Sequence, residues 1–220
     1  KRVLFAASLA DDIRFGGDRF ALQPALRLDV AWSALSINSD IDTASFPDPM
    51  QVFVSPRLSL RARATPWLTF KGSGGRFVRF PTLLELFGDG AFILGRPSVR
   101  PEDAWGGDAG FAITGKTRRF EGVVEAAFFG RHVTDLIAFT PVAFANAALN
   151  IGSARILGTE VRARGAAFHT IFLTVAYTFL DALNQTIVTG AAGHQLPARP
   201  RHDFTGRIEL ARGPFRVGYE

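Results

Sequence analysis

Cysteine is absent from this sequence, and histidine is scarce, with four residues among 220. Without cysteine the chain can form neither a disulfide framework nor a thiolate metal site. The histidines His132, His169, His194 and His202 lack the spacing of a metal-binding motif, and His202 is interpreted as a residue at the start of a strand. No Ser-His-Asp spacing indicates a hydrolase. We therefore expect no enzyme activity, no catalytic residue, no metal and no cofactor.

Long runs of one residue type are also absent. Apolar residues make up 47% of the chain, yet no uninterrupted apolar run approaches the roughly 18–20 residues that a membrane helix needs. Lys and Arg number 25 against 20 Asp and Glu, but these charges are scattered and form no basic arm. We expect no nucleic-acid partner. Because the chain begins with Lys-Arg and no signal peptide, we expect it to be an excerpt of a longer protein.

What the sequence does contain is strict alternation. In the segment 157–164, Leu157, Thr159, Val161 and Ala163 alternate with charged residues. Alternation with a period of two predicts a strand with one apolar and one polar face. Six segments can be phased with no charge on the apolar face, as a lipid-facing surface requires. These segments are 20–32, 57–64, 120–131, 157–164, 170–179 and 204–210.

Short and long connections alternate along the chain. Short turn signals occur at 16–18, 65–67, 115–118, 165–167 and 212–214, and longer connections at 33–50, 80–102, 134–150 and 183–200. Tight turns on one side and long loops on the other are typical of a transmembrane β-barrel. Aromatic residues beside the short turns favour an aromatic girdle at one membrane interface over the capped end of a soluble core. They are Phe15, Phe20, Trp67, Phe120, Phe168 and Phe215.

We therefore predict an all-β fold of antiparallel transmembrane strands with short periplasmic turns and long extracellular loops. A proline within the second strand, Pro24, predicts a bulge there because proline donates no ladder hydrogen bond. Ten strands are expected, which could close a narrow barrel or form an arc of a wider one. They are 1–15, 19–32, 52–64, 67–79, 103–115, 119–132, 152–164, 168–181, 202–211 and 214 onward.

The stretch GRFVRFPTLLELFGDGAFILGRPSVRPE (75–102) resembles the signature of the TonB-dependent outer-membrane receptors. Three further pieces resemble that family in order and spacing: FFGRHVTDLIAF (128–139), NIGSARILGTEVRA (150–163), and AYTFLDA with LPARPRHDF (176–204). Together the four cover roughly 50–212. Arg96 departs from the pattern, since the family usually has Asn at this position.

The resemblance implies that residues 1–220 are part of a receptor barrel, an arc of a larger barrel of about 22 strands, without the plug domain or closing strands. It implies uptake of a scarce solute, of the ferric siderophore, cobalamin or saccharide class, energised through TonB contacts with the missing plug. Outer-membrane lipid would surround the strands, and the localisation would be the Gram-negative outer membrane. The residues matching the motif at the barrel rim are Arg79, Pro81, Glu85, Leu86, Pro97, Pro101 and Glu102. Glu85 is expected to meet an arginine or cap backbone amides in a short helical turn.

Charged residues on the other face of the strands are candidates for a polar wall inside the barrel, where they would pair with one another or a plug and contact a passing solute. They are Arg57, Arg61, Arg63, Glu121, Glu125, Glu160, Arg162, Arg164, Arg207 and Glu209. The alternatives are a passive porin or adhesin barrel, an outer-membrane enzyme with a lipid-facing site, and a soluble β protein. Substrate selectivity is expected in the long loops.

Overall fold

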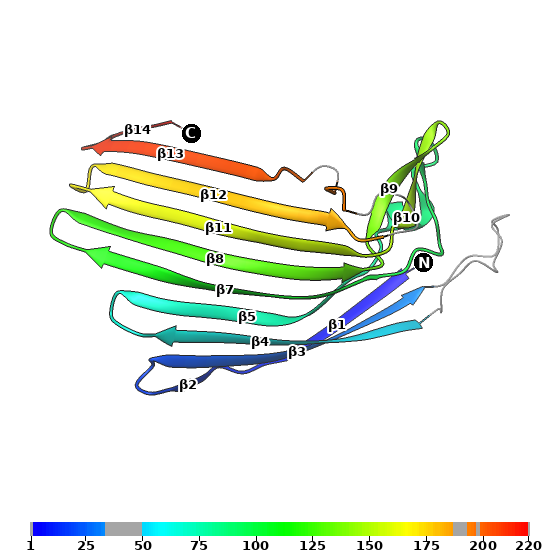
Figure 1. Cartoon of the computed structure of the whole chain (residues 1–220), viewed down its shortest axis with the longest axis horizontal. Helices are drawn as coiled ribbons and strands as arrows, with labels where there is room; N and C mark the ends of the chain where they lie inside the picture. The colour runs from blue at the N-terminus through cyan, green and yellow to red at the C-terminus, as the bar shows by residue number, and fades with distance from the viewer. Residues whose placement is uncertain (1, 34–49, 187–192, 197–198, 220) are drawn as a thin grey trace.

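The computed structural model describes residues 2–33, 50–186, 193–196 and 199–219. Most of them lie in one antiparallel sheet, in which each strand pairs with its neighbour along the main path (Figure 1). The order is β1-β3-β4-β5-β7-β8-β11-β12-β13-β14, with β2 also paired to β3. The strands are β1 (Arg2–Ala10), β2 (Ile13–Phe15), β3 (Phe20–Ser33), β4 (Met50–Arg63), β5 (Leu68–Arg79), β7 (Glu102–Lys116), β8 (Phe120–Thr134), β11 (Ala154–Ala167), β12 (Ile171–Asn184), β13 (His202–Arg212) and β14 (Phe215–Tyr219).

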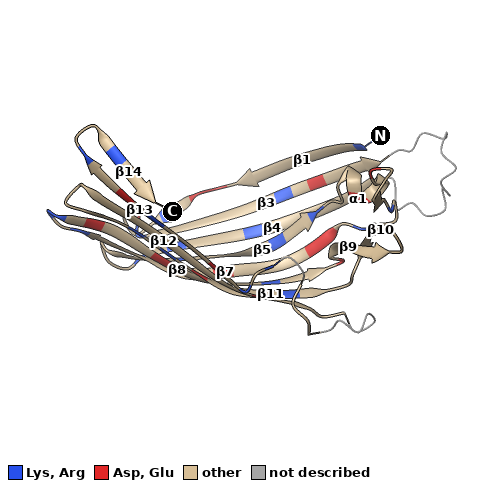
Figure 2. Cartoon of the chain, turned by 90° about the horizontal axis from the view of Figure 1, so that it is seen from above, with Lys and Arg blue, Asp and Glu red and all other residues tan. Residues whose placement is uncertain are grey.

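Seen from above, the sheet is an open trough with β1 and β14 at its two edges (Figure 2). Within the described residues β1 and β14 each pair on one side only. The expected strands are confirmed, the first of them as the pair β1 and β2, and the sheet is an arc of a barrel rather than a closed one. No helix among these residues is long and apolar enough to cross a membrane.

The register gives every strand the same two faces. Arg57, Glu125, Arg162 and Arg207 lie on one side, which we call the polar face, and Leu58, Val124, Val161 and Ile208 lie on the other, the apolar face. All six phased segments keep charge off the apolar face, as expected. Beyond those segments the same face carries ionisable residues, most of them where the strands approach the long loops: Arg76, Asp103, His132, Arg155, Asp181 and His202.

The short connections all lie at one end of the sheet, the turn end, and the long ones at the other, the loop end (Figure 1). All six predicted girdle aromatics sit at the turn end and are exposed. The turn predicted at 165–167 is wrong: Gly165 lies inside β11, and the turn falls at 168–170. Phe168 and His169 adopt positive φ angles of 54° and 55° there, a conformation that glycine-based signals do not predict.

The predicted bulge at Pro24 is also wrong. The β3–β4 register runs unbroken through Pro24, which pairs with Leu58. The nitrogen of Pro24, which carries no hydrogen to donate, faces the edge strand rather than β4. The Pro24 carbonyl faces the same way and accepts from Asp11 N at 3.1 Å. Pairing stops at Asp11 and Asp12, and this divides the edge strand into β1 and β2. A proline is tolerated there because only the outermost pairing loses a hydrogen bond.

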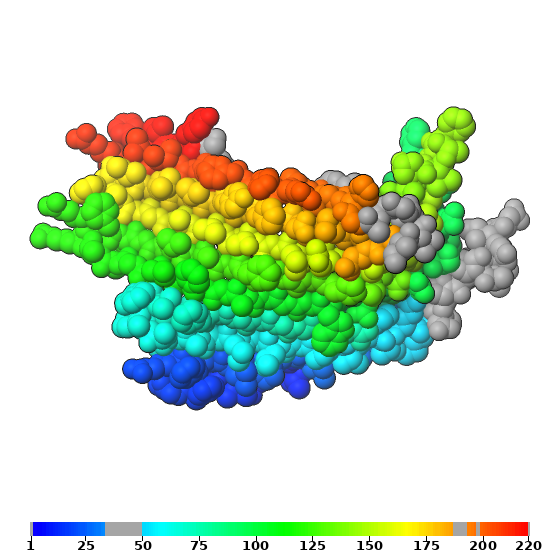
Figure 3. All heavy atoms as spheres, viewed as in Figure 1, coloured from blue at the N-terminus to red at the C-terminus, as the bar shows by residue number. Residues whose placement is uncertain are grey.

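The loop end carries the expected short helix, α1 (Leu83–Phe87). It also carries a three-stranded sheet that the sequence patterns did not predict, made of β6 (Ile93–Leu94), β10 (Ala145–Asn150) and β9 (Ile137–Val142), beyond the ends of the long strands. The hairpin of β9 and β10 projects from the continuous surface of the large sheet (Figure 3). The loop 33–50 lies almost wholly outside the described residues. The largest buried cluster also lies at this end, on the polar face: Ala104, Val133, Leu136, Ala154, Ile156, Ala182 and Leu196.

Candidate functional site at the loop end and on the polar face

Helix α1 begins with a complete capping box. Thr82 is the N-cap, its hydroxyl accepts from Glu85 N at 3.2 Å, and the Glu85 carboxylate accepts from Thr82 N at 2.6 Å. This reciprocal pair satisfies two amides that the first turn would leave without partners. Pro81 precedes the cap and is buried, and Leu86 buries the inner side of the helix. The predicted helical turn over TLLELF is therefore confirmed, and its start is fixed by local chemistry.

Arg79, the last residue of β5, joins this helix to the large sheet. Its guanidinium donates to both oxygens of Glu85 at 3.1–3.2 Å and to Glu102 at 2.7 Å. Glu102 also accepts from Ile137 N at 2.9 Å, at the start of β9. The carboxylates are largely buried, with 8% and 14% of their side chains exposed. One arginine thus ties α1, the first residue of β7 and the small sheet together. Glu85 fulfils both expectations, since it meets an arginine and caps a backbone amide.

The electrostatics of the loop end favour ionised carboxylates. Burial raises the pKa of Glu85, but hydrogen bonds from Arg79 and from the Thr82 backbone outweigh it, so the net pKa is below its usual value. The pKa of Asp89 is also lowered, chiefly because its carboxylate accepts from the amide of Ile93 and also from those of Ala91 and Phe92. Both side chains are therefore fixed acceptors at neutral pH.

The return from α1 to β7 is held by close backbone contacts. Gly88 and Gly95 cross so tightly that a Cβ on Gly95 would lie 2.2 Å from Gly88 N. Arg96 N donates to Glu85 O at 2.9 Å. Pro101 is buried and Pro97 half-buried. All seven motif residues therefore lie at the loop end, between the end of β5 and the start of β7.

A second clamp at this end was missed. Asn150, the last residue of β10, accepts from Arg100 N at 2.8 Å and donates to the carbonyls of Arg100 and Asp135 at 3.0 and 2.6 Å. Arg100 and Asp135 also form a salt bridge. Asn150 is the first residue of the stretch NIGSARILGTEVRA, and that position was its signal in the sequence. Nothing in the sequence indicated which residues it contacts.

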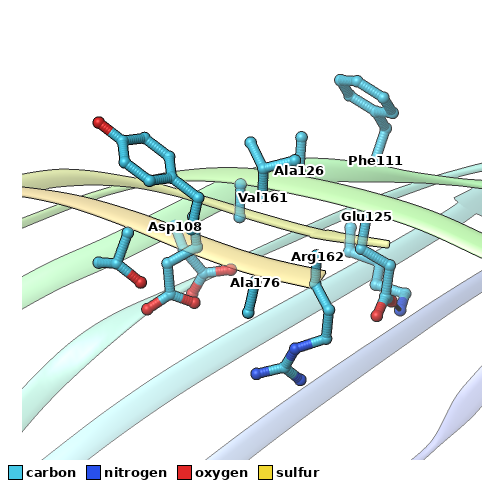
Figure 4. Close-up of a pocket in the computed structure, with 13 residues that line it drawn as sticks. Asp108, Phe111, Glu125, Ala126, Val161, Arg162 and Ala176 are labelled. Atoms are coloured by element: carbon cyan, nitrogen blue, oxygen red, sulfur yellow. Dashed lines mark hydrogen bonds and ion pairs between the residues drawn. The ribbon is translucent and has the colours of Figure 1, made fainter. Parts of the chain in front are cut away.

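The ten candidates for a polar wall all lie on the polar face, as their alternation predicted. Arg57, Arg61 and Arg63 come from β4, Glu121 and Glu125 from β8, Glu160, Arg162 and Arg164 from β11, and Arg207 and Glu209 from β13. Figure 4 shows the middle of this surface: Asp108, Glu125, Ala176 and Arg162 point to one side of the sheet, and Phe111, Ala126 and Val161 to the other.

The pairing of these residues is only partly as expected. Arg207 and Glu209 form a salt bridge with each other. Glu125 pairs with Lys71 at 2.9 Å and Glu121 with Lys116 at 3.0 Å, two lysines that were not among the candidates. Within the described residues the other six candidates form no salt bridge. In the part of the chain that the structure describes, the polar face therefore keeps arginines that form no salt bridge.

Proline also shapes the join between β4 and β5. The donor that Pro56 lacks faces β5, and the pairing of these strands ends at the next residue, Arg57 with Gly75. Arg76 fills the opening: it donates to Val54 O at 3.0 Å and binds Asp103 through two hydrogen bonds of 2.9 and 2.7 Å. No sequence pattern pointed to this ion pair, because Arg76 occupies an apolar-face position.

The described residues hold no group of three or more His, Cys, Asp or Glu side chains arranged to bind a metal ion. The surface instead offers arginine forks, fixed carboxylates and backbone amides, which are groups that bind and orient polar molecules.

The sequence profile of the family described as "TonB dependent receptor-like, beta-barrel" matches residues 2–219. The chain belongs to this family of β-barrels. The family match extends beyond the resemblance at 50–212 to both edge strands. A search of curated protein sequences finds no relative.

Solved structures with the same fold are receptors and transporters rather than enzymes. The copper transporter OprC has a TM-score of 0.72 and 18% identity, over 99% of this chain and 34% of its own. The siderophore receptor PiuA from Acinetobacter baumannii has a TM-score of 0.69 and 17% identity, over 99% and 32%. The Serratia marcescens hemophore receptor HasR, solved with its hemophore HasA and heme, has a TM-score of 0.65 and 15% identity, over 99% and 42%. The chain spans about a third of the length of OprC and PiuA.

Proposed function

We propose that this chain is an arc of an outer-membrane receptor barrel that takes up a scarce solute with energy passed through TonB. The observation that carries the proposal is the family match over residues 2–219. The sheet supports it, because one face is apolar enough to meet lipid while the other carries paired and unpaired charges suited to a wet interior.

We propose further that residues 1–220 are one part of the barrel domain, which strands and a plug elsewhere in a longer protein would complete. Unpaired edges at β1 and β14 support this, since an open sheet edge in lipid leaves backbone groups without partners. In such a barrel the seven motif residues around Arg79 hold the extracellular mouth together. The ten charged residues from Arg57 to Glu209 line the lumen.

The solute class is part of the proposal. Copper, siderophore and heme are named for the similar structures, and these names support a metal or a metal chelate. Cobalamin or a saccharide are the other classes that the family resemblance implies. A passive porin remains the alternative, and it differs in needing neither TonB nor a plug.

The test uses the full-length protein encoded by the gene that contains this chain. It would be expressed in a Gram-negative host that lacks its own receptors, with and without a functional TonB. Labelled iron chelates, cobalamin and oligosaccharides would be supplied at low concentration. Accumulation that disappears without TonB supports the proposal. Accumulation that is unchanged without TonB, and that rises linearly with solute concentration, identifies a passive pore instead.

A further inference from the structure

A row of four residues crosses the polar face near the loop end. Arg57 on β4 pairs with Gly75 on β5, Gly75 with Gly106 on β7, and Gly106 with Arg131 on β8. Both glycines are required by close packing: a Cβ on Gly75 would lie 2.5 Å from Pro56 O, and one on Gly106 would lie 2.7 Å from Gly130 O. The row therefore places one arginine on each side of two glycines, which leave a gap without side chains of their own.

Phe77 fills this gap. The guanidinium carbon of Arg57 lies 4.3 Å from the centre of its ring, and that of Arg131 lies 4.9 Å from the same centre. Both distances are within the range of a cation–π interaction. Phe77 also packs against the buried cluster at the loop end, so the ring has a fixed place. Because both cations are measured from one ring centre, they are at most about 9 Å apart.

The charge of this pair is not neutralised by the rest of the described structure. Within it, neither Arg57 nor Arg131 forms a salt bridge or a side-chain hydrogen bond, and both residues are exposed. Three acids on the polar face of neighbouring strands have partners: Asp29 binds Arg27, Asp108 accepts from the Ser73 hydroxyl, and Glu125 binds Lys71. Glu160, on the polar face of β11, forms no salt bridge with either arginine within the described residues. Two like charges within about 9 Å repel each other, and an anion that contacts both guanidinium groups would offset that repulsion.

We propose that Arg57, Arg131 and the Phe77 ring between them form a binding site for a small solute that carries several carboxylates. The inference rests on the proposed function, and it names the chemistry of the solute that this wall would take. One protein carboxylate fills one guanidinium fork, whereas this pair presents two forks around a single ring. Such an arrangement suits a compact polycarboxylate, either free or as the ligand shell of a metal ion.

The test is equilibrium binding of citrate and of ferric citrate to the purified full-length protein, which needs no TonB and so separates this inference from active transport. We expect the unmodified protein to bind at least one of the two. Arg57→Gln and Arg131→Gln should each weaken binding by about tenfold to a hundredfold, because each loses a charge-assisted hydrogen-bonding partner. Arg118→Gln, in the exposed turn between β7 and β8 at the turn end, is the matched control and should change affinity less than twofold.

A second variant separates positioning from charge. Phe77→Leu keeps both arginines but removes the ring between them, so binding should weaken, whereas Phe77→Tyr should retain it. Folding of every variant would be checked by heat-dependent electrophoretic mobility. The proposal is overturned if neither form of citrate binds, or if the two arginine variants bind as the Arg118 variant does. It is also overturned if both arginine variants lower thermal stability while citrate affinity is unchanged, which would indicate that a protein segment occupies the pair.

Discussion

The two ends of the sheet are held in different ways. At the turn end, β-strands are joined by turns of two to four residues, and the side chains beside them are exposed aromatics, with Phe15 stacked on Phe20 and Phe120 edge-on to Phe168. At the loop end, Arg79 connects groups 6 and 23 residues away, and Glu102 reaches an amide 35 residues away. Local backbone geometry therefore determines the turn end, whereas a network of distant partners determines the loop end.

The largest effect should come from removing the centre of that network. In Arg79→Ala, Glu85 and Glu102 lose their cation while remaining largely buried, so we expect the loop end to be destabilised by about 3 kcal/mol. Hydrogen exchange in the segment 80–102 of the full-length protein would accelerate, while exchange at the turn end would not. Arg79→Lys keeps the positive charge but loses the two-pronged guanidinium group. The stability of its loop end should lie between that of the unmodified protein and that of Arg79→Ala.

Much of this difference follows from how far a sequence pattern reaches. Alternation predicted the strands and placed all ten charged candidates on one face, because a period of two depends only on neighbouring residues. The capping box of Thr82 and Glu85 is equally local. The hairpin of β9 and β10 was not predicted, since its short strands are fixed by pairing with one another and with β6. The contact of Phe77 with two arginines requires the register of three strand pairs, which no pattern within one strand contains.

The second prediction concerns a close approach on the polar face. Gly75→Ala puts a Cβ 2.5 Å from Pro56 O and 2.9 Å from the Cα of Arg57, both main-chain atoms that cannot move aside alone. We expect a loss of about 1–3 kcal/mol in the free energy of unfolding. Gly115→Ala is the matched control near the turn end, because nothing lies within 4 Å of its added Cβ. Equal melting temperatures for the two variants would show that β4 and β5 are not packed this closely.

A third, smaller effect should appear in acid. The pKa of Glu85 is lower in the folded protein than its ordinary value of 4.5, so its ionised form contributes stability at neutral pH. That contribution is present above pH 4.5 and is lost as the pH falls through the lower folded pKa. The protection of the α1 amides against hydrogen exchange should therefore fall as the pH is lowered through this range. Glu85→Gln should remove most of the dependence, and an unchanged profile in that variant would assign the effect to other carboxylates.

The smallest effect tests the claim that backbone geometry alone determines the turn end. His169 has φ +55°, which costs a residue with a Cβ more than it costs glycine. His169→Gly should therefore stabilise the protein by about 0.5–1 kcal/mol, after the greater freedom of glycine in the unfolded chain is counted. Gly213 has φ +59° and no atom within 4 Å of an added Cβ, so Gly213→Ala should destabilise by a similar amount. Opposite shifts in the melting temperature would confirm that these turns depend on φ. A loss of stability in His169→Gly would instead show that the imidazole makes a contact that matters, and the turn end would then resemble the loop end.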